Sequence, residues 1–267
     1  MLKRLVVVCA GKQSLHARWE TELCHFDLLV VNYSSETAWK SFNGECYRHE
    51  VATKWHHVKW FIQFHRDIIE AYDSIWFPDD DLYMHPMDVN LMFDIFEKEQ
   101  IVLALPSYAT NSYFTHLSIG YHRPFFQYRE VSFVEIICPL FKKDVLLSVS
   151  QHFDEVISGW GLDYLIAEIL KDKKKCIIDA VQFVHTRPIG GGNLYQELKI
   201  NPYDEMNKLQ KKYNLTKIMQ SYSGKLTCGL KVPGIIVFLL DFFYMKMKMK
   251  SVLKRYKAFH YHSLRGR

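Results

Sequence analysis

Three consecutive aspartates, Asp79, Asp80 and Asp81, follow a short apolar run at residues 74–77. Like charges this close raise one another's pKa and destabilise a fold unless a cation neutralises them. On an extended backbone Asp79 and Asp81 point to the same side and Asp80 to the other, so the spacing offers two carboxylates to one ion. Oxygen ligands of this kind suit Mg²⁺ or Mn²⁺, which complete their coordination with diphosphate oxygens and water. The alternative is that the aspartates cap the next helix or solvate a turn.

The segment SGWGLD at residues 158–163 could carry catalytic chemistry. Its glycines permit close backbone approach, Trp160 could stack on a sugar, and Asp163 could act as a general base. We therefore predict Asp163 as the catalytic residue and place Trp160 and Gly161 at the acceptor. The alternative is a Gly-Trp turn in which Asp163 caps the following helix.

An imidazole and a guanidinium occur together in the segment VHTRP at residues 184–188, which precedes three glycines at residues 190–192. His185 is a candidate third metal ligand, and Arg187 is a candidate contact to a diphosphate. The alternative is a loop histidine held by hydrogen bonds.

The first apolar run, residues 5–9, stops at a turn and suits a buried parallel strand whose end faces a ligand. We therefore predict that Cys9, Ala10 and Gly11 bind the donor together with Asp80.

Two further polar residues lie in the middle of the chain, where an acceptor pocket is expected after the donor half. They are Glu135 and His116. Structural roles are the alternative for both residues.

Apolar runs suited to strands alternate with segments of helical periodicity along the chain. The predicted strands are residues 5–9, 26–31, 74–77, 101–105, 132–141 and 176–184. The predicted helices are residues 54–72, 89–99 and 163–171, with a further helical segment that ends at residue 22. We assign no regular structure to residues 107–129. The alternation predicts an α/β fold with a mostly parallel central sheet flanked by helices, which binds ligands at the carboxyl ends of its strands.

Four ordered motifs, WFPDDDL, SFVEIICPLF, SGWGLDYL and IIDAVQFVHTRPIGGG, span the chain. Their succession over residues 5–204 resembles the DUF707 group of proteins, which look like GT-A glycosyltransferases. The resemblance implies a GT-A-like, Rossmann-like fold and a nucleotide-sugar-dependent transferase. By motif position it places the metal on Asp79, Asp81 and His185, and the base on Asp163.

The resulting hypothesis is an inverting, metal-dependent transfer of a sugar to a hydroxyl of a glycan or lipid-linked acceptor, in cell-surface polysaccharide or glycolipid synthesis. A UDP-sugar is the favoured donor because UDP is common among DxD enzymes. One alternative is a nucleotidyltransferase, which also places paired aspartates on metal and phosphates. Another is a non-catalytic glycan- or nucleotide-binding module of the same fold.

The charge of the chain is unevenly distributed. Residues 246–267 hold eight Lys or Arg and no acid, so the net charge of +5 becomes −3 for the remainder. Nucleic-acid binding is therefore not expected. The tail follows a strongly apolar segment at residues 232–244, which is too short to span a bilayer. This composition favours an interfacial anchor on an anionic membrane surface, and the alternative is a core-packed helix followed by a disordered basic tail.

We divide the chain into a catalytic domain at residues 1–213 and an apolar and basic appendage at residues 214–267. The six cysteines are scattered without a zinc-site spacing, which favours a reducing compartment. The N-terminal apolar run resembles a first strand more than a signal peptide. We therefore expect a cytoplasmic protein, peripheral on the inner face of the membrane.

Overall fold

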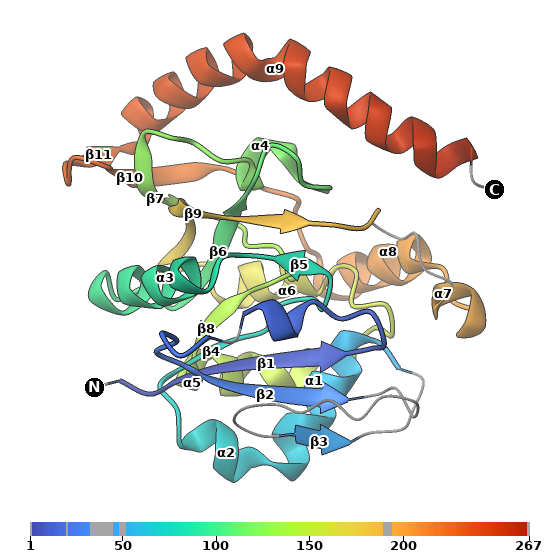
Figure 1. Ribbon diagram of the computed structural model, residues 1–267. Helices are drawn as coiled ribbons and strands as arrows, with labels where there is room; N and C mark the ends of the chain where they lie inside the picture. The colour runs from blue at the N-terminus through green and yellow to red at the C-terminus, as the bar shows by residue number, and fades with distance from the viewer. Residues whose placement is uncertain (1, 20, 33–44, 48–51, 189–193, 266–267) are drawn as a thin grey trace.

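The computed structural model describes residues 2–19, 21–32, 45–47, 52–188 and 194–265 (Figure 1). Its central feature is one mixed β-sheet with the strand order β11-β10-β7-β9-β6-β8-β4-β1-β2-β3, and β5 pairs with β9 off this path. The glycines at residues 190–192 lie outside the described residues.

The first half of the chain forms the parallel part of the sheet. Its strands are β1 (Arg4–Ala10), β2 (Asp27–Asn32), β3 (Glu45–Tyr47) and β4 (Ser74–Trp76). β1 pairs in parallel with both β2 and β4, and β2 pairs in parallel with β3. The runs of Leu, Val and Ile that predicted β1 and β2 are buried, as is typical of strands covered on both faces.

From residue 82 onward the chain adds strands of both directions. The remaining strands are β5 (Leu82–Tyr83), β6 (Leu103–Tyr108), β7 (Phe126–Val131), β8 (Leu140–Lys142), β9 (Lys175–His185), β10 (Ser221–Leu226) and β11 (Lys231–Pro233). The pairings give β1, β2, β3, β4, β6, β9 and β10 one direction, and β7, β8 and β11 the opposite one. The prediction of a mostly parallel sheet flanked by helices is therefore confirmed.

Helices pack against this sheet along the chain. They are α1 (Lys54–Phe64), α2 (Arg66–Glu70), α3 (Pro86–Lys98), α4 (Leu117–Gly120), α5 (Lys143–Val149), α6 (Leu162–Ile169), α7 (Leu194–Glu197), α8 (Pro202–Tyr213) and α9 (Gly234–Arg265). Short 3₁₀ turns occur at η1 (His16–Arg18) and η2 (Ser150–His152). The single helix predicted over residues 54–72 is split at His65 into α1 and α2.

Two local predictions were wrong, and one further segment had been left unassigned. The helix expected before residue 22 is only the turn η1, because Leu15 donates its backbone N–H to Asp80 O and ties this segment to the aspartate loop instead. Residues 132–141 form no long strand, and only β8 pairs there. Phe133 and Val134 are apolar because they fill the core from an irregular loop. Residues 107–129, left unassigned, contain α4 and the start of β7.

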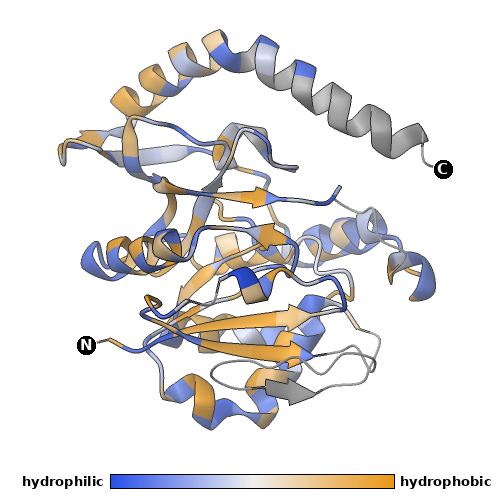
Figure 2. Cartoon of the chain, in the orientation of Figure 1, coloured by the Kyte–Doolittle hydropathy of each residue, from blue (hydrophilic) through white to orange (hydrophobic). Residues whose placement is uncertain are grey.

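The segment after residue 213 continues the same sheet. β10 pairs with β7, and α9 packs against β10. Figure 2 shows apolar residues along the inner strands and again along the first turns of α9. The domain boundary at residue 213 stays a prediction. Among the described residues, no helix has the length and apolar character needed to cross a membrane.

Candidate metal and donor site

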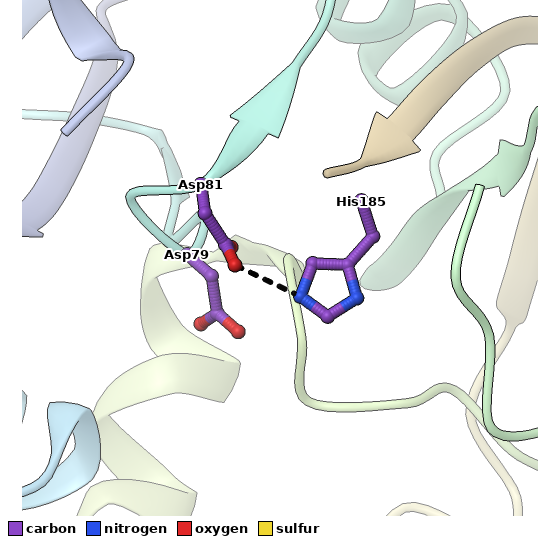
Figure 3. A group of neighbouring side chains, drawn as sticks. All are labelled: Asp79, Asp81 and His185. Atoms are coloured by element: carbon purple, nitrogen blue, oxygen red, sulfur yellow. Dashed lines mark ion pairs between the residues drawn. The ribbon is translucent and has the colours of Figure 1, made fainter. Parts of the chain in front are cut away.

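A short strand pairing assembles the predicted metal ligands. The three aspartates lie between β4 and β5, and β5 pairs antiparallel with the end of β9, where Leu82 is opposite His185. As Figure 3 shows, Asp79, Asp81 and His185 point toward one another, and their ligand atoms all lie within 4.8 Å. The structure therefore brings together the three residues predicted to hold a metal.

Hydrogen bonds to the backbone hold the Asp81–His185 pair in place. The Nε2 atom of His185 lies 3.2 Å from Oδ2 of Asp81. Thr186 donates both its backbone N–H (3.2 Å) and its hydroxyl (2.7 Å) to the Asp81 carbonyl, and the His185 N–H donates to Ser112 Oγ at 2.8 Å. Burial alone would lower the pKa of His185, but its hydrogen bond to Asp81 and the Asp81 charge raise it.

Asp79, the third member of the cluster, is contacted by Lys54. Lys54 was not predicted from the sequence. Lys54 Nζ lies 2.6 Å from Asp79 Oδ1 and also donates to the carbonyls of Ile136 and Ile137. Desolvation raises the pKa of Asp79, and the Asp81 charge adds to this, whereas Lys54 opposes it. The Asp79 side chain is still 35% exposed. A carboxylate has two oxygens, so the ion pair leaves Asp79 able to contact a second cation.

Asp80 connects the aspartate loop to the end of β1, and its role in donor binding stays a prediction. Its Oδ2 accepts the Gly11 N–H at 3.0 Å, and Arg187 Nη1 lies 3.8 Å from its Oδ1. Arg187 also donates to the Gln13 carbonyl at 2.6 Å. Burial raises the pKa of Asp80 to about 6, against the Gly11 hydrogen bond. These contacts gather Gly11, Asp80 and Arg187 at one end of the sheet.

Cys9 and Ala10 are the last two residues of β1, and both are buried. The Cys9 thiol faces the Lys54 carbonyl at 3.8 Å. Their side chains therefore face the protein interior, and only their backbone could approach a ligand. Their role in donor binding stays a prediction.

Asp163 lies in the first turn of α6 and not at its N-cap, which is Gly161. The Asp163 side chain is buried, and its Oδ1 accepts the N–H of Tyr164 at 2.9 Å. Desolvation and the nearby charge of Glu135 raise the pKa of Asp163 to about 8. A carboxyl group with such a pKa can exchange a proton near neutral pH, as a general base must.

Glu135 lies near both His185 and Asp163. It accepts a 2.8 Å hydrogen bond from the Tyr108 hydroxyl. Its charge helps to raise the pKa of both His185 and Asp163. The irregular loop that replaces the predicted strand therefore places Glu135 near both groups, and its acceptor role stays a prediction.

The other predicted acceptor residues lie in different surroundings. His116 packs edge-on against Phe133 and Tyr164, and burial lowers its pKa. The Trp160 indole donates to the Tyr195 hydroxyl at 3.1 Å. Gly161 has φ +94°, and a Cβ there would lie 3.3 Å from α8, so helix packing accounts for this glycine. The acceptor roles of His116, Trp160 and Gly161 stay predictions.

The three converging side chains fit a divalent cation. Two carboxylates and one imidazole supply oxygen and nitrogen donors, a set that suits Mn²⁺ and leaves positions for phosphate oxygens. The Nδ1 atom of His185 is buried and has no hydrogen-bond partner among the described residues. The cluster therefore has the donors and the excess negative charge that a cation would satisfy.

No known protein family model matches this chain. No curated protein matches it either, so the DUF707 resemblance stays a prediction. The chain is similar to solved structures at low identity. A197 from STIV aligns with a TM-score of 0.41 and 12% identity, over 69% of this chain and 85% of that one.

Two further solved structures align with most of this chain. S. aureus TarS 1–349 aligns with a TM-score of 0.46 and 10% identity, over 80% of this chain and 71% of that one. GalNAc-T7 with UDP, GalNAc and Mn²⁺ aligns with a TM-score of 0.49 and 7% identity, over 81% of this chain and 55% of that one. These scores are low, so neither the site nor the function is inferred from them.

Proposed function

We propose that this protein is a metal-dependent glycosyltransferase with a GT-A-like fold. The observation that carries the proposal is the convergence of Asp79, Asp81 and His185 within 4.8 Å, beside a loop that ties Asp80 to the end of β1. An excess of negative charge at the carboxyl ends of parallel strands suits a cation and a nucleotide diphosphate together.

The metal would be held by Asp79, Asp81 and His185. When bound, a Mn²⁺ or Mg²⁺ ion neutralises the negative charge that develops on a leaving nucleoside diphosphate. Arg187 is 42% exposed and lies next to Asp80, so its guanidinium is placed to bind the same diphosphate. The hydrogen bond from the Gly11 N–H to Asp80 would hold the loop that follows β1 next to the donor.

Asp163 is the proposed base. It accepts the proton of an acceptor hydroxyl as the oxygen attacks the anomeric carbon from the face opposite the leaving group, which inverts the configuration. The raised pKa means that the carboxyl is protonated at low pH and becomes a base as the pH approaches about 8. Retained configuration in the product, measured by NMR, would remove Asp163 from this role.

The acceptor side of the proposal rests on Glu135, His116 and Trp160. Glu135 lies close enough to Asp163 to raise its pKa, and His116 packs against Tyr164, the next residue along the chain. With Trp160, three positions before Asp163, they offer one carboxylate and two rings to a sugar. We propose a glycan or lipid-linked hydroxyl as acceptor, in cell-surface polysaccharide or glycolipid synthesis, and a UDP-sugar as donor.

Thermal-shift measurements with a panel of nucleoside diphosphates, each with and without Mn²⁺, test the proposal. We expect one nucleotide to raise the melting temperature only when Mn²⁺ is present, and the shift to vanish in Asp81→Asn. Asp144→Asn, at an exposed position of α5, is the matched control and should respond like the parent protein. A shift that needs no metal would contradict the proposal. Pyrophosphate release from a nucleoside triphosphate would replace it with a nucleotidyltransferase.

A further inference from the structure

Helix α9 has one face that packs on the protein. Val237 is fully buried in a small apolar cluster with Phe126 and Val232. Asp241 pairs with the buried Arg123, whose Nε donates to it at 3.0 Å. Tyr244, one turn further on, is also buried. These contacts fix the rotation of the first three turns about the helix axis.

The opposite face of the same turns is apolar and exposed. The residues on it are Ile235, Phe238, Leu239, Phe242 and Phe243. Their spacing of i, i+3, i+4, i+7 and i+8 forms one stripe along the helix. Phe238 is 61% exposed and Phe243 is 60% exposed. A soluble protein has a free-energy cost for such a continuous patch unless another surface covers it.

Basic residues continue this stripe toward the C-terminus. Lys246 and Lys250 follow at the i+11 and i+15 positions, and both are exposed, as are Lys248 and Lys254. Residues 246–267 contain eight Lys or Arg and no acid. Figure 1 shows α9 lying across one side of the molecule, with its outer face away from the sheet. The helix therefore presents an apolar band and a cationic band on one accessible side.

We propose that this face of α9 lies in the interface of an anionic lipid bilayer, parallel to the membrane plane. The phenylalanines and leucine then enter the acyl boundary, and the lysines contact the headgroups. A second copy of the chain could cover the apolar band. It would add another acid-free tail of the same sign and leave the cationic band unmatched. The anionic bilayer matches both bands, and this inference is independent of the proposed sugar transfer.

The test is co-sedimentation of the purified full-length chain with vesicles. One set is phosphatidylcholine alone, and the other contains phosphatidylserine as well. We expect binding to the anionic set, weakened by high salt. Lys246→Gln/Lys250→Gln/Lys254→Gln should lower the partition coefficient by about a hundredfold, because each lysine near an anionic surface contributes separately. Phe238→Ser/Phe242→Ser should lower it by about tenfold or more.

A matched pair of substitutions controls for general surface changes. Phe64→Ser on α1 and Lys142→Gln at the end of β8 remove an aromatic ring and a charge that are similarly exposed elsewhere, and they should leave binding unchanged. Point substitutions are preferable to removal of α9, because Asp241 and Tyr244 belong to the folded core. Absent or equal binding to both vesicle types would overturn the proposal. So would a dimer that Phe238→Ser/Phe242→Ser dissociates in a chain that binds no vesicles.

Discussion

Two regions of the molecule, one around Arg129 and one around Asp81, each bury several ionisable side chains. The balance of positive and negative charge differs between them. In the first, Arg129 donates to both oxygens of Asp179, at 2.7 and 3.1 Å, and the two side chains are fully buried. Arg123 and Asp241 complete the set with a second ion pair. Two cations and two anions satisfy one another there, so this cluster needs no further ion.

In the second region, anions outnumber the cations close to them. Three aspartates, Asp79, Asp80 and Asp81, lie together, whereas two cations are near them: Lys54 pairs with Asp79, and Arg187 lies 3.8 Å from Asp80. Burial raises the pKa of both Asp79 and Asp80. The contrast teaches that burial of charge alone does not mark a functional site. An imbalance among buried charges is the better indication of a binding site, because an unpaired buried charge has a free-energy cost that a bound ligand of opposite charge can remove.

The largest expected effect is on turnover in Asp81→Asn. The substitution removes one negative charge from the unbalanced cluster but keeps an oxygen that can accept from His185. If the cluster holds the catalytic metal, sugar transfer should fall on the order of a thousandfold, since metal catalysis is worth several kcal/mol. The measurement is a steady-state assay of donor consumption in Mn²⁺, with circular dichroism to establish that the fold is retained. Near-normal transfer in a folded variant would exclude the metal role of Asp81.

The balanced cluster should respond in stability instead. Asp179→Asn leaves the buried Arg129 guanidinium without its charge partner, so we expect a loss of about 3–5 kcal/mol in the free energy of unfolding. Urea denaturation measures this directly, and Asp144→Asn is the exposed control, with an expected change within about 0.5 kcal/mol. A small change in Asp179→Asn would mean that the contrast between the two clusters is wrong.

Much of the parallel core was predictable from the sequence, because a strand buried on both faces is a continuous apolar run. Residues 5–9, 26–31 and 176–184 were predicted for this reason, and they form most of β1, β2 and β9. The order of strands across the sheet was not predictable. The antiparallel β8 lies between β4 and β6 through pairings that no local pattern encodes. Residues 132–139 were misread because apolar core residues in a loop have the same composition as a strand.

The convergence of Asp79, Asp81 and His185 was predictable because the aspartates follow one apolar run and His185 ends another, and such ends meet at one edge of a parallel sheet. Lys54 was missed because it contacts Asp79 only through the fold, across 25 positions of sequence. The raised pKa of Asp163 likewise depends on burial and on Glu135, which the sequence does not place beside it. The sequence therefore predicts which residue types could bind or react, but it does not predict the charges and burial around them.

A smaller effect is expected from metal binding to the resting protein. Mn²⁺ added to about a hundred times its dissociation constant should stabilise the folded chain by about 2.7 kcal/mol, because the ion binds the assembled ligands and not the unfolded chain. Urea denaturation with Mn²⁺ and with a chelator measures the difference. Asp81→Asn should lose most of it, and Asp179→Asn should keep it despite its lower stability. Equal stabilisation of the parent protein and Asp81→Asn would place the ion elsewhere.

The last prediction concerns the pH dependence of stability in the metal-free protein. The pKa of Asp163 is about 8 in the fold and 3.8 ordinarily, so the folded chain takes up a proton between these values. The contribution of Asp163 to the free energy of unfolding is therefore fully present below about pH 4. It falls as the pH rises, by about 1.4 kcal/mol per pH unit until about pH 8. Asp163→Asn removes this dependence, so its advantage over the parent protein in urea denaturation should grow with pH. Asp144→Asn should show a constant difference. A constant difference for Asp163→Asn as well would mean that Asp163 is already ionised in the folded chain across this pH range, which would contradict the prediction.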